Sequence, residues 1–124
     1  MIKIIQTEKA AAAIGPYSQG ICSGELLFTS GQIPVDPQSG EVPEGIEAQT
    51  VQALENLKAI AEEAGTDLTR TVKTTCFLTD MDHFTRFNAI YADYFTGRPA
   101  RSCIAVKALP KDVLVEVEAI IKIK

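Results

Sequence analysis

The sequence has no tryptophan, a single histidine and only three cysteines, Cys22, Cys76 and Cys103. The cysteines are odd in number, widely spaced and never arranged as C-x-x-C, so they predict neither a disulfide framework nor a structural zinc site. Unpaired cysteines are typical of a reducing compartment, and we therefore expect a cytoplasmic protein without a bound metal.

Long apolar runs and an excess of positive charge are also missing. No apolar stretch approaches the roughly 18–20 residues of a membrane-spanning helix. The first residues, M-I-K-I-I-Q-T-E-K, predict a short strand and not a signal peptide. Sixteen acidic residues against twelve basic ones give a net charge of −4. Because phosphate binding requires a concentrated positive field, we do not expect a nucleic acid as partner, and the lack of a long apolar run argues against a membrane.

The common catalytic motifs are absent too. The chain has no Walker loop, no G-x-G-x-x-G, no H-E-x-x-H and no G-x-S-x-G. His83, the only histidine, lies beside Asp82 at the expected start of a helix, where we predict a solvated surface side chain. Catalysis by a histidine-containing triad therefore has little support.

What is present describes one globular unit. The 124 residues, 46% apolar and 23% charged, suit a single domain spanning 1–124. Patterning predicts strands at 2–5, 18–23, 26–30, 71–79, 101–107 and 113–123. A helix is expected over 47–64, with its apolar stripe formed by Val51, Leu54, Leu57, Ala61 and Ala64. Gly65 follows in the position where a left-handed residue ends helices.

A second helix is expected after Asp80 or Asp82, either of which can cap it. It ends at Gly97 and Pro99, and its aromatic stripe comprises Phe84, Phe87, Tyr91 and Tyr94.

Two helices and six strands indicate an α/β (α+β) two-layer sandwich in which the helices cover only one sheet face. On the last strand Val115, Val117, Ala119, Ile121 and Ile123 share the face expected under the helices. The opposite face carries Glu116 and Glu118, and it is either solvated or buried against further subunits.

Arg101 and Glu116 are the most informative polar residues. Arg101 begins a strand just after Pro99, and a planar guanidinium is well suited to grip a carboxylate. It can equally form a structural salt bridge with Glu116 or Glu118. Glu116 and Glu118, two residues apart, can split their pKa values and act in acid–base chemistry, or can be solvated or paired with Arg101 and Lys107.

Three further residues are candidates for a site, and two of them have two interpretations. Tyr17, after Gly15-Pro16, is a core aromatic or a hydroxyl aimed at a ligand. Asn88, between Phe84 and Tyr91, more often caps a neighbouring backbone than touches a substrate. Cys103 reads as a small buried apolar residue, with no neighbour except Arg101 to lower its pKa.

Several ordered motifs resemble one family. They are I-G-P-Y-S-Q-G at 14–20, T-S-G-Q-I-P at 29–34, K-T-T-C-F-L-T-D at 73–80, N-x-x-Y-x-x-Y-F at 88–95, P-A-R-S-C at 99–103 and L-P-K-D-V-L-V-E-V-E-A-I at 109–120. Across essentially its whole length the chain is similar to the RidA (YjgF) family of reactive-intermediate imine deaminases.

The resemblance implies a six-stranded mixed sheet with two helices on one face, similar to trimeric chorismate mutase. Three subunits would join their sheets into a barrel with active sites between them. The implied reaction is hydrolysis of 2-iminobutanoate, 2-iminopropanoate and their enamines to 2-keto acids and ammonia, without a cofactor. Family members have also been described as regulatory interaction proteins and as translation inhibitors with endoribonuclease activity, which remains the alternative.

Carried over by motif, Arg101 would bind the substrate carboxylate and Glu116 would position or activate water. The main chain at Cys103 would contact the ligand, and Glu118 would be structural. Other lining positions are Tyr17, Ser30, Gly31 and Asn88. One departure concerns Thr96-Gly97-Arg98, because many members have a longer stretch there, often with an aromatic where this chain has Arg98. It affects the outer pocket wall and the preferred substrate size.

Overall fold

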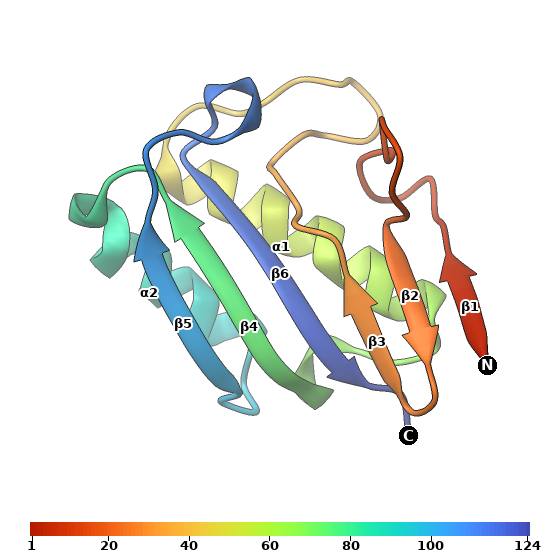
Figure 1. Cartoon of the computed structure of the whole chain (residues 1–124). Helices are drawn as coiled ribbons and strands as arrows, with labels where there is room; N and C mark the ends of the chain where they lie inside the picture. The colour runs from red at the N-terminus through yellow and green to blue at the C-terminus, as the bar shows by residue number, and fades with distance from the viewer.

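A computed structural model describes all 124 residues of the chain. One mixed six-stranded sheet has the order β1-β2-β3-β6-β4-β5, and helices α1 and α2 pack on the same face of it (Figure 1). The strands are β1 (Ile2–Ile5), β2 (Gly20–Ser23), β3 (Leu26–Thr29), β4 (Thr71–Leu78), β5 (Ala100–Ala105) and β6 (Val115–Lys122). The helices are α1 (Ile46–Glu63) and α2 (Phe84–Tyr94). The predicted two-layer fold is confirmed, with strand ends shifted by a residue or two.

The core lies between the helices and the central strands. Strand β6 alternates as predicted, with Val115, Val117, Ala119 and Ile121 buried under the helices. Helix α1 contributes Leu54, Leu57, Ile60 and Ala61 to this core. The predicted stripe is wrong at one end, because Val51 is 40% exposed and Ile46, Gln49 and Thr50 are buried in that turn instead. Neither helix meets the length and hydropathy of a membrane-crossing segment.

Both helix boundaries have simple local causes. Gly65 adopts φ +84 after the C-terminus of α1, as predicted. Asp80 caps a short 3₁₀ turn (Met81–His83) by accepting a hydrogen bond from the Asp82 N–H at 2.8 Å, and this turn leads into α2. His83, expected in solvent, is only half-exposed, and its Nδ1 is buried without a hydrogen-bond partner.

A β-bulge interrupts the pairing of β3 with β6. Phe28 lies opposite Ile120, whereas Gln32 lies opposite Val117. The segment that follows β3 therefore has one residue more between these two pairs than β6 has. The Thr29 hydroxyl accepts the Ala119 N–H at 3.0 Å and so satisfies one donor that the bulge leaves unpaired. The bulge places Ser30 and Gly31 outside the regular ladder, directly beside β6.

Candidate functional site

The structure sorts the seven predicted site residues into two groups on opposite faces of the sheet. Strand β5 pairs in parallel with β4, which sets Arg101 beside Thr74 and Cys103 beside Cys76 on the helix-covered face. Glu116 lies opposite Phe77 on the other, open face. Asn88, Arg101 and Cys103 form what we call the arginine half-site. The glutamate half-site comprises Tyr17, Ser30, Gly31 and Glu116.

The Arg101 side chain contacts three residues of helix α2. Its guanidinium carbon lies 4.7 Å from the ring centre of Tyr91 and 5.4 Å from that of Phe84. Its Nη1 donates a hydrogen bond of 2.6 Å to Asn88 Oδ1. The predicted alternative of a salt bridge to Glu116 or Glu118 is wrong, because the sheet separates these carboxylates from Arg101. An arginine fixed by one hydrogen bond and two aromatic faces keeps its other N–H donors for an anion.

The aromatic rings beside Arg101 are the part of this half-site that sequence reasoning missed. Phe84 and Tyr91 were assigned to the apolar stripe of the second helix. Their spacing from Asn88, four residues on one side and three on the other, places all three on one helix face and is the signal that could have revealed them. The Tyr91 hydroxyl is in turn hydrogen-bonded to Thr74 Oγ1 at 2.6 Å, which locks the ring beneath the guanidinium.

Cys103 contributes no reactive thiolate. Burial raises the pKa of the Cys103 thiol, and this outweighs the opposing effect of the Arg101 charge. Cys103, expected as a small buried apolar residue, is only half-buried. What Cys103 offers the half-site is its main chain next to Arg101.

In the glutamate half-site the carboxylate of Glu116 lies against the backbone of Gly31. A side chain on Gly31 would overlap Glu116, since its Cβ would come within 2.8 Å of the carboxyl carbon. Glu116 is half-buried, and this burial raises the pKa of its carboxyl above the usual 4.5; the nearby Glu118 charge raises it further. The bulge after β3 is thus what brings a glycine and a poised carboxylate together.

Tyr17 lies in the loop that precedes β2, and Ser30 follows β3, directly before Gly31. Tyr17 is 52% exposed, which decides between its two interpretations in favour of an accessible side chain. It shares with Gly31 a hollow of about 410 Å³. The Ser30 hydroxyl donates a hydrogen bond of 2.6 Å to the Ser18 carbonyl. Its proton is therefore engaged within the protein, and its oxygen can still accept a hydrogen bond from a ligand.

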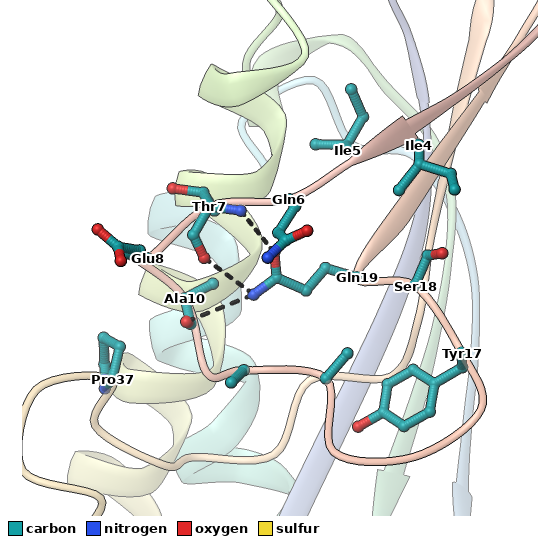
Figure 2. A pocket seen from close by; sticks show the side chains of 12 residues that line it. Ile4, Ile5, Gln6, Thr7, Glu8, Ala10, Tyr17, Ser18, Gln19 and Pro37 are labelled. Atoms are coloured by element: carbon teal, nitrogen blue, oxygen red, sulfur yellow. Dashed lines mark hydrogen bonds between the residues drawn. The ribbon is translucent and has the colours of Figure 1, made fainter.

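Gln19 holds this loop in place and was not predicted. Its buried side-chain amide donates to the carbonyls of Thr7, Ala10 and Ala11, and its Oε1 accepts the Thr7 N–H at 2.7 Å. Figure 2 shows the bonds to Thr7 and Ala10. The clamp closes the segment after β1 over a hollow of about 590 Å³ that Tyr17 also lines. Gln19 therefore sets the position from which Tyr17 is presented.

The two half-sites offer complementary chemistry. One presents an oriented cation suited to a carboxylate, and the other presents a carboxylate of raised pKa suited to accepting a proton. Since they lie on opposite faces, one chain cannot bring them to the same ligand.

Comparison with known proteins places the fold in a family. The family described as endoribonuclease L-PSP matches residues 7–123. The 2-iminobutanoate/2-iminopropanoate deaminase of Escherichia coli K12 is 52% identical in an alignment of 124 positions that covers 97% of each chain.

Solved structures agree with this match. A putative endoribonuclease from Thermotoga maritima has a TM-score of 0.94 and 50% identity, covering 97% of this chain and 96% of that one. Escherichia coli TdcF, solved with bound serine, has a TM-score of 0.93 and 47% identity, covering 97% and 98%. The resemblance drawn from the motifs is confirmed, and the chain belongs to the endoribonuclease L-PSP family, which includes deaminases of 2-iminobutanoate and 2-iminopropanoate.

Proposed function

We propose that the protein hydrolyses 2-imino acids such as 2-iminobutanoate and 2-iminopropanoate, with their enamine tautomers, to 2-keto acids and ammonia. The observation that carries this proposal is the oriented Arg101, fixed by Asn88 and two aromatic rings with donors left over. The name of the Escherichia coli deaminase and the serine bound to TdcF support a small amino-acid-like ligand.

The reaction asks little of the protein beyond positioning. In a 2-imino acid the C=N carbon is already electrophilic, so water adds to it once the carbon and the water are held about 3 Å apart. Arg101 binds the carboxylate through two N–H donors. Main-chain groups at Gly31 and Cys103 orient the imine, while Tyr17, Ser30 and Asn88 line the ligand. Addition of water and loss of ammonia balance the equation with no change of oxidation state.

Glu116 is the proposed base. Its carboxylate accepts a proton from the attacking water and passes it to the imine nitrogen, which gives a carbinolamine. It then moves the hydroxyl proton of this intermediate to the amino nitrogen, which leaves as ammonia while the C=O bond forms. The raised pKa of Glu116 suits it to both transfers, because a catalytic group works best when its pKa approaches the working pH. Glu118, on the same face and exposed, contributes its charge and no contact.

The proposal includes a homotrimer whose sites are shared. The open sheet face exposes large apolar side chains, among them Ile2, Ile4, Phe28 and Ile104. Closing three such faces together would bury these side chains, and the edge strand β5, which carries Arg101, would then adjoin the glutamate half-site of the next copy. We also propose the cytoplasm as its location, since its three cysteines are free thiols.

Combining two impaired variants tests function and assembly together. Arg101→Ala removes the anion grip and should lower kcat/KM about 10- to 200-fold, the equivalent of one charge-assisted bond. Glu116→Gln keeps the shape and removes the base. The substrate is 2-iminobutanoate, generated in the cuvette by threonine dehydratase and trapped as its semicarbazone.

Co-expression of the two variants should restore about a quarter of the wild-type activity, because one shared site in four then carries both intact residues. Full activity in Arg101→Ala alone would contradict the carboxylate grip. Absence of any restoration, from variants that assemble normally, would contradict the shared site.

A further inference from the structure

A hollow of about 720 Å³ beside Arg101 carries two arginines and no acid. It lies between the end of α2 and the start of β5, and its lining is formed by Asn88, Tyr91, Ala92, Phe95, Thr96, Arg98, Pro99 and Arg101. The ion pairs of the structure lie elsewhere, between Arg86 and Glu47 and between Lys122 and Glu25. Two guanidinium groups without a carboxylate partner make this hollow locally positive, although the chain carries a net charge of −4.

The backbone holds Arg98 in an unfavourable conformation to achieve this. Arg98 has φ +55, in the left-handed region that residues with a Cβ avoid. Glycine would relieve the strain, yet the glycine of this turn is at position 97. There it is needed for close approach, because a Cβ on Gly97 would lie 2.6 Å from the Thr69 carbonyl oxygen. The turn is closed by a hydrogen bond of 3.1 Å from the Arg98 N–H to the Phe95 carbonyl.

The position of the Arg98 backbone is therefore fixed by the residues before and after it. The tight turn after α2 is pinned against Thr69, and Pro99 restricts the residue that precedes it. The Cα–Cβ bond of Arg98 consequently starts from a defined direction, and the side chain borders the same hollow as Arg101. Strained backbone that persists in a folded protein often serves a ligand site.

We propose that Arg98 determines substrate specificity by binding a second acidic group, so that the enzyme favours 2-imino acids whose side chain ends in a carboxylate. The inference rests on the proposed function, in which Arg101 holds the carboxylate next to the reacting carbon. The second carboxylate of a four- or five-carbon dicarboxylic imine then lies in the hollow and accepts hydrogen bonds from the N–H groups of Arg98. A monocarboxylic imine has no group that reaches Arg98, so only Arg101 contributes to its binding.

The test compares two imines in three proteins. An L-amino acid oxidase generates the imines in place from aspartate or from 2-aminobutanoate, and kcat/KM is measured for each. Arg98→Asn removes the charge, and because asparagine tolerates the left-handed conformation the turn is kept. Arg86→Gln is the matched control, since it removes an exposed arginine of α2 that lies outside the hollow.

The wild type should favour the dicarboxylic imine, and Arg98→Asn should lower this preference about 10-fold, which corresponds to about 1.4 kcal/mol. Arg86→Gln should leave it unchanged. An unaltered preference in Arg98→Asn, with 2-iminobutanoate turned over normally, would overturn the specificity role and leave the proposed function intact. Failure of the wild type to hydrolyse either imine would instead overturn the proposed function.

Binding without turnover provides the independent measurement. Calorimetric titration with 2-oxoglutarate and with 2-oxobutanoate should show tighter binding of the dicarboxylate in the wild type. Arg98→Asn should lose that difference, and Arg98→Lys should retain part of it, because lysine keeps the charge but not the planar fork. Equal affinities of the wild type for both keto acids would refute the proposal whatever the enzyme assay shows.

Discussion

Replacing Gly31 with alanine should disable the enzyme while leaving every proposed catalytic group in the chain. The new Cβ would overlap the Glu116 carboxylate and lie only 2.8 Å from its carboxyl carbon, whereas ordinary contact begins at 3.4 Å. The backbone at Gly31 is fixed by the bridge between Gln32 and Val117. The carboxylate is therefore the part that must yield, by roughly 1 Å, and a displacement of that size can cost about 100-fold in rate.

The loss should appear in kcat more than in KM, because Arg101 and its carboxylate grip lie on the far face of the sheet. About 100-fold corresponds to about 2.7 kcal/mol of transition-state stabilisation. The assay is hydrolysis of freshly generated 2-iminobutanoate, with urea unfolding of the same preparation to report stability. Glu116→Gln provides the comparison for a glutamate that is present in shape but inactive as a base.

Gly24→Ala is the control for backbone effects. Gly24 has φ +61 in the turn between β2 and β3, and a Cβ there meets nothing within 4 Å. This variant should lose about 1 kcal/mol of stability through strain and keep its kcat/KM. A folded Gly31→Ala protein with wild-type kcat would refute the reasoning, since Glu116 would then be dispensable or free to move.

Two further predictions concern charge and loop order. The activity should fall on the acid side with an apparent pKa above 4.5, because Glu116 must be ionised to act as base and burial raises its pKa; Glu118→Gln should move this fall to lower pH, since it removes the second cause of the shift. A pH profile unmoved by Glu118→Gln would exclude that coupling. Gln19→Ala should destabilise the fold by about 2–4 kcal/mol, because it strands several backbone groups of the first loop at once, and urea unfolding measures this. A loss below about 0.5 kcal/mol would show that water replaces the clamp.

Local patterning was sufficient for the element order and for the buried face of β6. The alternation of Val115, Val117 and Ala119 with charged residues is a period-2 signal that does not depend on distant contacts. Asp80 and Gly65 likewise mark helix boundaries through local hydrogen bonding and backbone freedom.

Patterning could not assign the face of β5. Alternation groups Arg101 with Cys103 but does not say on which side of the sheet they lie. That depends on the parallel register with β4, which sets Arg101 beside Thr74 under helix α2. For this reason the sequence left open a pairing of Arg101 with Glu116 that the sheet forbids.

The bulge after β3 was equally out of reach, because it is a mismatch between two strands about 90 residues apart in the chain. Burial was wrongly predicted for Val51, which is exposed, and for His83, which is partly buried. Helical spacing alone predicts a stripe but not its exact edge.

The placement of Arg101 and Glu116 on opposite faces has a consequence for how the enzyme behaves on dilution. Under the proposed assembly an isolated chain has no complete site, so specific activity would depend on total protein concentration and disappear below the dissociation constant of the trimer. The same arrangement would allow complementation between alleles. A chain defective at Arg101 would inactivate one site but contribute an intact Glu116 to another. Two alleles, one defective at Arg101 and one at Glu116, could therefore restore activity in one cell.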